Sequence, residues 1–353
     1  MLIPFVDLSF LFFFSLVTTF TMRKVAQRVR LVDKPSTRKQ HNGSIPLVGG
    51  ISICISLLYF LFNNPTLLPN NNLYVACILI LVGVGALDDK YDISFKLRFA
   101  IQAALSVAMM VIGDIELSTI GDVLGTGEII TLGWFGYFVT ILAVVGAINA
   151  FNMVDGIDGL LGGLSIVTFG GLGIMLAYDG QQNLAYICLV LVVTMLPYIL
   201  LNLGAFGRRR KVFMGDAGSM LIGFTVIWLL LLSSQNGTAP PLRPVTALWL
   251  IAVPLMDMTA IMIRRIRRGD SPFKPDREHL HHIFQRLGLT SFQTLIAICT
   301  IATLYAAVGI YSEIYNIPEY LMMYTFLGCF TIYLIFISNI WRITKKIRIV
   351  QKD

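Results

Sequence analysis

The chain has 353 residues, of which 56% are hydrophobic and only 13% are charged, and its mean hydropathy is +0.76. Because a soluble domain is about a quarter charged, these values exclude an ordinary cytosolic enzyme, a secreted disulfide scaffold and a disordered chain. They favour a polytopic membrane protein. The formal net charge of +7 would suggest nucleic acid in a soluble protein, so its meaning depends on where the charges lie.

Apolar runs long enough to span a bilayer recur along the whole chain. We count eleven, at 2–22, 45–63, 72–87, 98–113, 134–151, 159–178, 184–203, 217–234, 245–263, 291–311 and 320–341. The predicted fold class is therefore all-α and polytopic, with one transmembrane unit covering 1–353. Residues 115–133 contain two β-rich stretches around Gly121 and Gly125, which predict a small external, periplasmic β-hairpin.

The basic residues predict how these runs are oriented. If the N-terminus lies outside, the inside segments hold 26 of the 27 Lys and Arg residues, at 23–44, 88–98, 152–158, 204–216, 264–290 and 342–353. Only Arg243 falls outside. The positive-inside rule then predicts an N-out, C-in topology, and it explains the net charge without nucleic acid as a partner.

The first polar cluster, GALDDKYDISFKLRF, follows the third run. Asp88 and Asp89 are adjacent, and Asp92 would share a helix face with Asp88 if the helix continued. Adjacent carboxylates need a cation or a shared proton, and Mg²⁺ is commonly held by one or two carboxylates plus substrate phosphates. Lys96 and Arg98 offer positive charge nearby. The alternative is a helix end whose basic side chains reach the membrane interface.

The second cluster, NAFNMVDGIDG, places Asn149, Asn152, Asp155 and Asp158 at intervals of three residues. Nine residues turn an α-helix by about 900°, so one helical face cannot hold all four side chains. A glycine follows each aspartate, which favours a break that lets the groups converge at the inner membrane surface. Such amides and carboxylates suit a metal, a sugar or a nucleobase, and a plain polar turn is the alternative.

The third cluster, RRRKVFMGDAGS, spans residues 208–219. Its small residues open the eighth run, and a helix N-terminus built from small residues is an anion site. Asp216 either caps that helix or holds a divalent ion beside a phosphate. Phe213 could stack on a base, although an aromatic residue at a membrane interface is common in itself.

The fourth cluster, DREHLHHIF, contains His279, His281 and His282. No cysteine or open-site pattern supports zinc. The favoured interpretations are contacts of these imidazoles and Arg277 with a diphosphate or sugar, or a plain solvated loop.

Asp257 lies within the ninth run, where an acid is either functional or bonded to a neighbouring helix. The sequence names no partner for it.

At these motifs the chain resembles the polyprenyl-phosphate N-acetylhexosamine-1-phosphate transferases. The segments DKPSTRKQHNGSIPLVGG, LDDKYD, NAFNMVDGIDG, VFMGDAGS and HLHH occur in the order of that family. Leu280 interrupts the histidine triplet, which resembles the GlcNAc branch rather than the peptidoglycan branch. The resemblance implies eleven spans in a bacterial inner membrane, with the N-terminus outside and the active site on the cytosolic face.

The implied reaction transfers GlcNAc-1-phosphate from UDP-GlcNAc to undecaprenyl phosphate, with Mg²⁺ or Mn²⁺ as cofactor and UMP as the second product. It would be the first membrane step of glycan synthesis of the O-antigen or enterobacterial common antigen type. The resemblance implies metal ligation by Asp216 and Asn152. It also implies catalytic roles for Asp88, Asp89, Asp155, Asp158, Lys96, His279 and His281. Substrate binding would fall to Asn152, Asn202, Phe213, Lys211, Arg277, His282, Arg38 and His41.

Within these roles, Asp88 would deprotonate or orient the lipid phosphate, Lys96 would hold a phosphate, and Phe213 would stack on uracil.

The same chemistry on UDP-GalNAc or UDP-MurNAc-pentapeptide stays open. A transporter would need acids in mid-span and paired repeats, and only Asp257 fits the first condition. A structural subunit would not need polar clusters on one face. The expected partners are the two substrates and the lipid bilayer, and a homodimer stays open.

Overall fold

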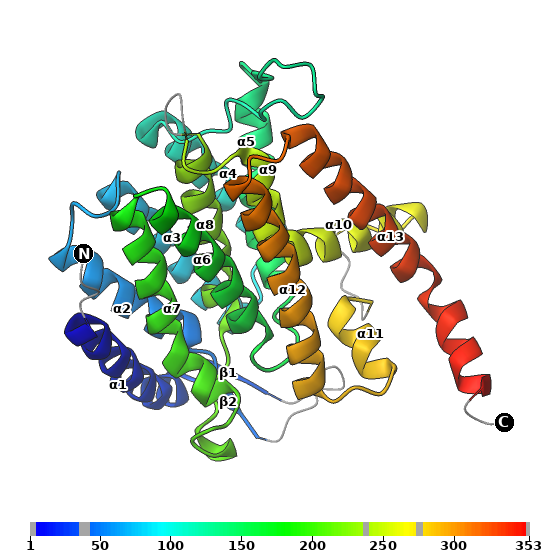
Figure 1. Cartoon of the computed structure of the whole chain (residues 1–353). Helices are drawn as coiled ribbons and strands as arrows, with labels where there is room; N and C mark the ends of the chain where they lie inside the picture. Colours follow the sequence, from blue (N-terminus) through cyan, green and yellow to red (C-terminus); the bar gives the residue numbers. More distant parts are fainter. Residues whose placement is uncertain (1–4, 35–42, 236–239, 273–277, 351–353) are drawn as a thin grey trace.

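The computed structural model describes residues 5–34, 43–235, 240–272 and 278–350, with side chains described as far as residue 340 (Figure 1). In chain order the elements are α1 (Phe5–Val29), β1 (Val32–Asp33), β2 (Ile45–Pro46), α2 (Gly49–Asn63), α3 (Asn71–Tyr91), α4 (Phe95–Gly113), α5 (Phe135–Met153), α6 (Leu160–Tyr178), α7 (Gln182–Asn202), η1 (Arg208–Arg210), α8 (Gly215–Ser234), α9 (Pro244–Leu250), α10 (Ala252–Arg267), α11 (Leu280–Arg286), α12 (Ser291–Ile314) and α13 (Glu319–Val350).

This is a multi-pass, mainly helical membrane protein, as the composition predicts. Among the described residues, nine helices are long and apolar enough to cross a bilayer, and the bent pair of α9 and α10 would make a tenth. The helix α2 has only 15 residues and is apolar. The eleven-span count and the N-out orientation therefore stay predictions.

The ninth apolar run differs from the continuous span predicted at 245–263. It breaks at Ile251, where α9 and α10 meet at 84°. Pro254 has no N–H to donate to the carbonyl of Leu250, so the helical ladder is interrupted there. That carbonyl instead accepts a hydrogen bond of 3.1 Å from the hydroxyl of Thr168 in α6. The bend is thus stabilised by a neighbouring helix.

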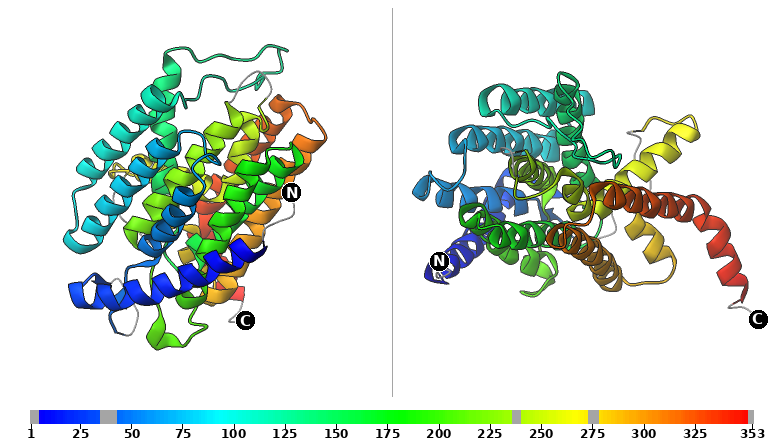
Figure 2. Two further views of the ribbon diagram at one scale, coloured as in Figure 1. Left: turned by 90° about the vertical axis from the view of Figure 1, so that its left-hand side faces the viewer. Right: turned by 45° about the horizontal axis from the view of Figure 1, so that its top comes forward.

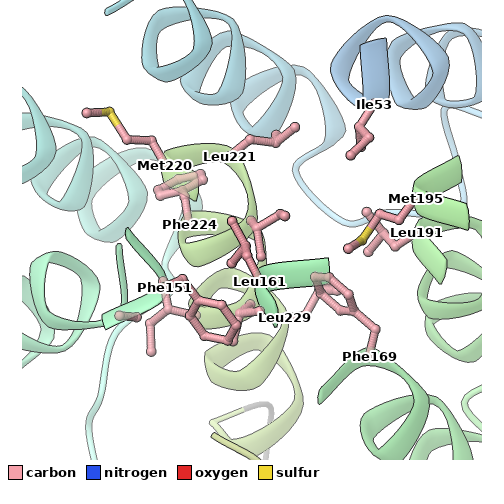
Figure 3. Packing of buried hydrophobic residues seen from close by; sticks show 14 of the residues in the cluster. Ile53, Phe151, Leu161, Phe169, Leu191, Met195, Met220, Leu221, Phe224 and Leu229 are labelled. Carbon is pink, nitrogen blue, oxygen red and sulfur yellow. The ribbon is translucent and has the colours of Figure 1, made fainter. Parts of the chain in front are cut away.

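Helix α8 forms the centre of the bundle. Every residue of α8 is buried except Asp216 at its start, and α2, α3 and α5 pack around it. Figure 3 shows Phe224 and Leu229 of α8 among Phe151 of α5 and Leu161 and Phe169 of α6. Burying such side chains requires tight fit, so the position of α8 is fixed relative to its neighbours.

Small residues bring α2 and α3 unusually close to the start of α8. A Cβ at Gly50 would lie 2.1 Å from the Cα of Gly218, and one at Gly85 would lie 2.4 Å from the Cα of Ala217. Real Cβ atoms do not approach backbone this closely, so both positions need glycine for the observed packing. This close contact carries the end of α3 to the first turn of α8.

The strands β1 and β2 form a short antiparallel pair, and Leu47 bridges in parallel to Phe213. These strands, η1 and α11 lie at one end of the bundle, and the connection between α4 and α5 lies at the other (Figures 1 and 2). In that connection, Thr119 pairs with Thr131 in an antiparallel bridge. The N–H of Ile120 donates to the carbonyl of Ile130, and the N–H of Ile130 donates to the carbonyl of Gly121. The predicted hairpin is therefore present as a single bridge rather than as two full strands.

Candidate active site

Two adjoining cavities lie where the polar motifs meet. The larger, of about 1130 Å³, we call the acidic cavity, and its lining includes Asp88, Asp89, Asp155, Asp158, Asp216, Lys211 and Phe213. The smaller, of about 390 Å³, we call the basic cavity, and its lining includes Arg98, Gln102, Arg265, His279 and His281. Asn152, Gly156 and His282 line both. Motifs from five separate parts of the chain thus converge on one region.

Arg98 lies between two carboxylates from different helices. Its guanidinium forms an ion pair with Asp88 and lies 3.5 Å from the carboxylate of Asp216. Asp88 is buried and also accepts a 2.8 Å bond from the backbone N–H of Ile93. Because α3 ends at Tyr91, Asp92 adopts a left-handed conformation and does not share a helix face with Asp88 as the sequence suggested.

The carboxylate of Asp89 caps helix α8 from the neighbouring helix α3. It accepts the backbone N–H groups of Asp216 at 2.9 Å and Ala217 at 3.4 Å. Gly215 has a φ of +75°, and a Cβ there would lie 2.4 Å from a carboxylate oxygen of Asp89. The anion site predicted at the start of α8 is therefore filled by a side chain of the protein itself.

Asn152 connects α5 to the first turn of α8. Its amide nitrogen donates to Asp216 at 2.6 Å and lies 2.8 Å from the hydroxyl of Ser219. Asn149, one turn earlier, donates to Gln102 of α4 at 3.2 Å. These contacts fix Asp216 beside the wall that both cavities share.

The break predicted in the second cluster is present, because α5 ends at Met153 and α6 begins at Leu160. Gly159 has a φ of +77°, and its N–H donates to Asn202 at 2.6 Å. The amide nitrogen of Asn202 in turn donates to the carbonyl of Val212 at 2.9 Å. Asn202 is buried and holds two loops in place while it lines the acidic cavity.

The turn also carries Asp155, an exposed residue that lines the acidic cavity. Partial desolvation, with repulsion from Asp216, Asp89 and Asp158, raises the pKa of its carboxyl to about 7. A group that holds its proton near neutral pH is typical of a site prepared for a cation or for proton transfer.

Opposite these acids, Lys211 forms an ion pair with Asp158. The Lys211 ammonium also lies 5.5 Å from the centre of the Phe213 ring. The backbone of Phe213 is fixed, because its N–H donates to Pro46 at 2.9 Å and its carbonyl accepts from Gly49 at 2.9 Å. One wall of the acidic cavity therefore consists of the Phe213 ring and the Lys211 ammonium. Backbone hydrogen bonds to the segment 46–49 hold this wall in place.

The histidines begin helix α11. The rings of His279 and His281 are parallel, with centroids 5.8 Å apart, and His282 lies 4.2 Å from His281. Burial lowers the pKa of His281 to about 3, so its ring is neutral at physiological pH. Its Nε2 is buried and has no hydrogen-bond partner among the described residues, and a Cβ at Gly156 would lie 2.1 Å from it. Only glycine in the α5–α6 turn leaves room for this ring.

Comparison with known proteins agrees with this geometry. A model of the family described as glycosyl transferase family 4 matches residues 72–234. The chain is 51% identical over 347 residues to the undecaprenyl-phosphate alpha-N-acetylglucosaminyl 1-phosphate transferase of Escherichia coli (strain K12), which covers 98% of this chain and 94% of that protein. The chain belongs to glycosyl transferase family 4.

Proteins of the same name from other bacteria are similar to this chain to the same degree. The protein from Yersinia pestis is 52% identical over 97% of this chain and 93% of its own length. That from Haemophilus influenzae (strain Rd) is 49% identical over 96% of this chain and 95% of its own length. The resemblance predicted from the motifs is thereby confirmed.

Not every residue that the resemblance singled out lies in the two cavities. Arg38, His41 and Arg277 lie outside the described residues. Lys96 is exposed and lines neither cavity, whereas Arg98 points to Asp88 and Asp216. On a helix these two residues are about 200° apart, so which of them faces the acids depends on the rotation of α4.

Sequence analysis gave no role to Gln102, Arg265 and Ser219. Arg265 is buried, lines the basic cavity and donates to the carbonyl of Pro272 at 2.6 Å. The sequence feature that could have identified these three residues is a polar or charged side chain inside or beside an apolar run. Burial of such a group is costly unless it is hydrogen-bonded or functional.

The donor chemistry of the acidic cavity fits a hard divalent cation. Asp216, in the first turn of α8, offers carboxylate oxygens, and Asn152 of α5, whose amide nitrogen donates to Asp216, offers an amide oxygen. Mg²⁺ is commonly held by one or two carboxylates plus substrate phosphates. Within the described part of the chain, no three His, Cys, Asp or Glu side chains are grouped as a complete metal cage.

Proposed function

We propose that this protein transfers GlcNAc-1-phosphate from UDP-GlcNAc to undecaprenyl phosphate and releases UMP. The observation that carries the proposal is the convergence of Asp88, Asn152, Asp216 and His281 on two adjoining cavities at one end of the bundle. The names of its relatives state the acceptor and the transferred group. A protein 51% identical over nearly its whole length supports the same chemistry here.

In the proposed reaction, an oxygen of the lipid phosphate attacks the β-phosphorus of UDP-GlcNAc. The new P–O bond joins the lipid to the sugar phosphate, and the bond from the β-phosphorus to the bridging oxygen breaks, so that UMP leaves. Both reactants are anions, and such transfers depend mainly on positioning and on neutralising charge. Arg98, Arg265 and Lys211 supply positive charge at the two cavities.

The two cavities suit different parts of the substrates. In the acidic cavity, Phe213 offers a face for the uracil ring and Asn202 holds the adjacent loops. Asp88 and Arg98 lie where the cavities adjoin, so they would orient the lipid phosphate. His279 and His281, on the basic side, would face the sugar and its phosphate.

Asp216, with Asn152 beside it, would hold Mg²⁺ or Mn²⁺. When bound, this cation would neutralise charge on the diphosphate of the donor. Asp89 keeps Asp216 at the start of α8 by binding its backbone N–H, and Asn152 restrains its side chain. Asp155, which holds its proton near pH 7, would respond to the charge that arrives with the substrates.

The proposed location is a bacterial inner membrane with the cavities on the cytosolic side. The support is the distribution of basic residues, because 26 of the 27 Lys and Arg fall in the segments assigned to that side. A nucleotide sugar arrives from water and a prenyl phosphate stays in the leaflet, so their reaction needs a site at the interface between the two.

Purified protein, incubated with radiolabelled UDP-GlcNAc, undecaprenyl phosphate and Mg²⁺, should yield a labelled lipid and one UMP for each sugar transferred. Parallel reactions with UDP-GalNAc and UDP-MurNAc-pentapeptide test the sugar, and GlcNAc should be preferred. Asp216→Asn should lower turnover by roughly 10²-fold or more without loss of the folded protein. Faster reaction with another sugar, or normal turnover in the variant, would contradict the proposal.

A further inference from the structure

Asp257 is the buried acid in α10 for which the sequence names no partner, and the structure gives it three. Its Oδ1 accepts a bond of 3.0 Å from the backbone N–H of Leu280 and one of 2.7 Å from the hydroxyl of Tyr333. Its Oδ2 lies 2.8 Å from Nδ1 of His279. The residue is only 1% exposed, so all of its hydrogen-bonding capacity is directed at these groups.

This arrangement selects one form of His279. The N–H of Leu280 and the hydroxyl of Tyr333 both donate to Oδ1, so within the described part of the chain Nδ1 of His279 is the one hydrogen-bond partner of the other oxygen. A carboxylate only accepts hydrogen bonds, so Nδ1 must carry the proton. In the neutral ring Nε2 then keeps its lone pair, and it is the nitrogen that His279 can present to the basic cavity that it lines.

The same contacts set the position of the whole histidine segment. Glu278, the residue before His279, is held by Arg264 of α10 at 3.0 Å. The His279 ring lies parallel to that of His281, which fits against Gly156 in the α5–α6 turn. Tyr333 adds a tie to α13, so the last helix is connected to the cavity through one carboxylate.

We propose that Asp257 and Tyr333 are positioning residues for the transfer reaction, because they hold His279 as the Nδ1–H tautomer with a basic Nε2 toward the basic cavity. There Nε2 would accept a hydrogen bond from an O–H group, either of the N-acetyl sugar or of a protonated lipid phosphate. The role of His279 rests on the proposed function. The tautomer does not, and it can be measured without substrates.

Asp257→Asn separates this proposal from a purely structural bond. The N–H of Leu280 is an obligate donor, so the oxygen of the introduced amide must face it and the NH₂ group must face His279. That arrangement donates to Nδ1 and moves the ring proton to Nε2. In serine proteases the corresponding substitution preserves the geometry and lowers kcat by about 10⁴-fold through the wrong tautomer.

The decisive measurement is ¹⁵N NMR of the full-length protein with labelled histidine, since the chain has only four histidines. The His279 signal, identified by its loss in His279→Gln, should show the Nδ1–H tautomer in the wild type and the Nε2–H tautomer in Asp257→Asn. The proposal is overturned if the wild type shows the Nε2–H form or if the two spectra agree. This result is independent of whether the protein transfers GlcNAc-1-phosphate.

Kinetics then test the consequence. After the wild type is shown to form product, Asp257→Asn should lower kcat roughly tenfold or more, and Tyr333→Phe by about twofold to fivefold. A change in the KM for UDP-GlcNAc identifies the sugar as the O–H donor, and a change in the KM for undecaprenyl phosphate identifies the lipid. Unchanged kcat in Asp257→Asn overturns the positioning role.

Tyr74→Phe is the matched control for Tyr333→Phe. The Tyr74 hydroxyl makes an equally short bond, 2.7 Å to the hydroxyl of Thr225 in α8, whereas the Tyr333 hydroxyl bonds an acid that contacts His279 of the basic cavity. It should lose similar thermal stability and keep the wild-type kcat. An equal fall of kcat in both variants would mean that Tyr333 acts only through the stability of the bundle.

Discussion

At the scale of single residues, the key feature of the site is that the basic side chain facing Asp88 and Asp216 is Arg98. Arg98 contacts Asp88 and Asp216, whereas Lys96 lines neither cavity. A planar guanidinium can bind two oxygens at once, which suits a position between two carboxylates and a phosphate. Arg98 is thus better placed than Lys96 to organise the anions in the proposed reaction.

Substitution of each cation tests this assignment. Arg98→Ala should lower kcat/KM by about 10²-fold or more, because it removes charge at the reacting phosphates and leaves buried Asp88 unpaired. Arg98→Lys should recover only part of the rate, since it lacks the forked geometry. Steady-state assays with Lys96→Ala as the comparison check the assignment, and a larger loss in Lys96→Ala would reverse it.

The second residue-scale prediction concerns Asp155. Its folded pKa of about 7 lies above its ordinary value of 3.8, so the folded protein binds the proton more tightly than the unfolded chain does. Ionised Asp155 therefore destabilises the fold, and the penalty grows as pH rises from 3.8 to 7 and is constant above that.

Asp155→Asn removes this penalty. It should raise the Tm by about 2 °C or more at pH 8 and by less at pH 5, measured by thermal unfolding in detergent without divalent cations. Asp179→Asn, at the end of α6 away from both cavities, provides the control. A gain in Tm that is equal at both pH values would show that the Asp155 carboxyl titrates normally.

At the scale of elements, the site depends on close approach of α3 to α8. Gly85 allows this contact, and through it Asp89 reaches the N–H groups that begin α8. Aspartates of two motifs far apart in sequence are therefore adjacent, because two helices carry small residues at one crossing point. A Cβ at Gly85 would meet the backbone of Ala217 and push the two motifs apart.

Gly85→Ala should accordingly destabilise the protein by about 1–3 kcal/mol through overpacking and should lower turnover as Asp89 moves from the start of α8. Gly83→Ala, in the same helix, is the matched control because a Cβ there meets nothing within 4 Å. Thermal unfolding and turnover of both variants should be compared. Equal behaviour would mean that the crossing tolerates a wider separation.

At the scale of the whole molecule, the polar ends of the bundle are chemically different. The β1–β2 pair, η1 and α11 lie at one end, and the bridged 115–133 segment lies at the other (Figures 1 and 2). The acidic cavity belongs to the first of these ends, because its lining includes Asp33 of β1, Lys211 after η1 and His282 of α11. The positive-inside rule predicts that the cavity end faces the cytosol. The orientation can be tested without reference to activity.

A membrane-impermeant thiol reagent gives that test. Arg209→Cys, in η1, should react only in inside-out membrane vesicles, and Thr126→Cys only in right-side-out vesicles or intact spheroplasts. The native cysteines give a low background because three are buried and two are partly buried. The opposite labelling pattern would invert the topology and place the cavities outside.

The sequence alone determined the membrane class, the approximate apolar runs, the family and most of the residues around the cavities. These features are written in local patterns: apolar length, the distribution of Lys and Arg, and short polar motifs at the ends of spans. The α5–α6 break is one example, because glycines after Asp155 and Asp158 mark it in the sequence itself.

The tertiary structure alone decided which groups touch. That Arg98 rather than Lys96 faces the acids, that Asp89 caps a helix from another helix, and that Asp257 holds His279 all depend on helix rotation and crossing. The bend at Ile251 likewise needs a hydroxyl from α6 to satisfy a freed carbonyl. Such contacts join residues up to 128 positions apart, and their geometry arises from side-chain packing that no local pattern records.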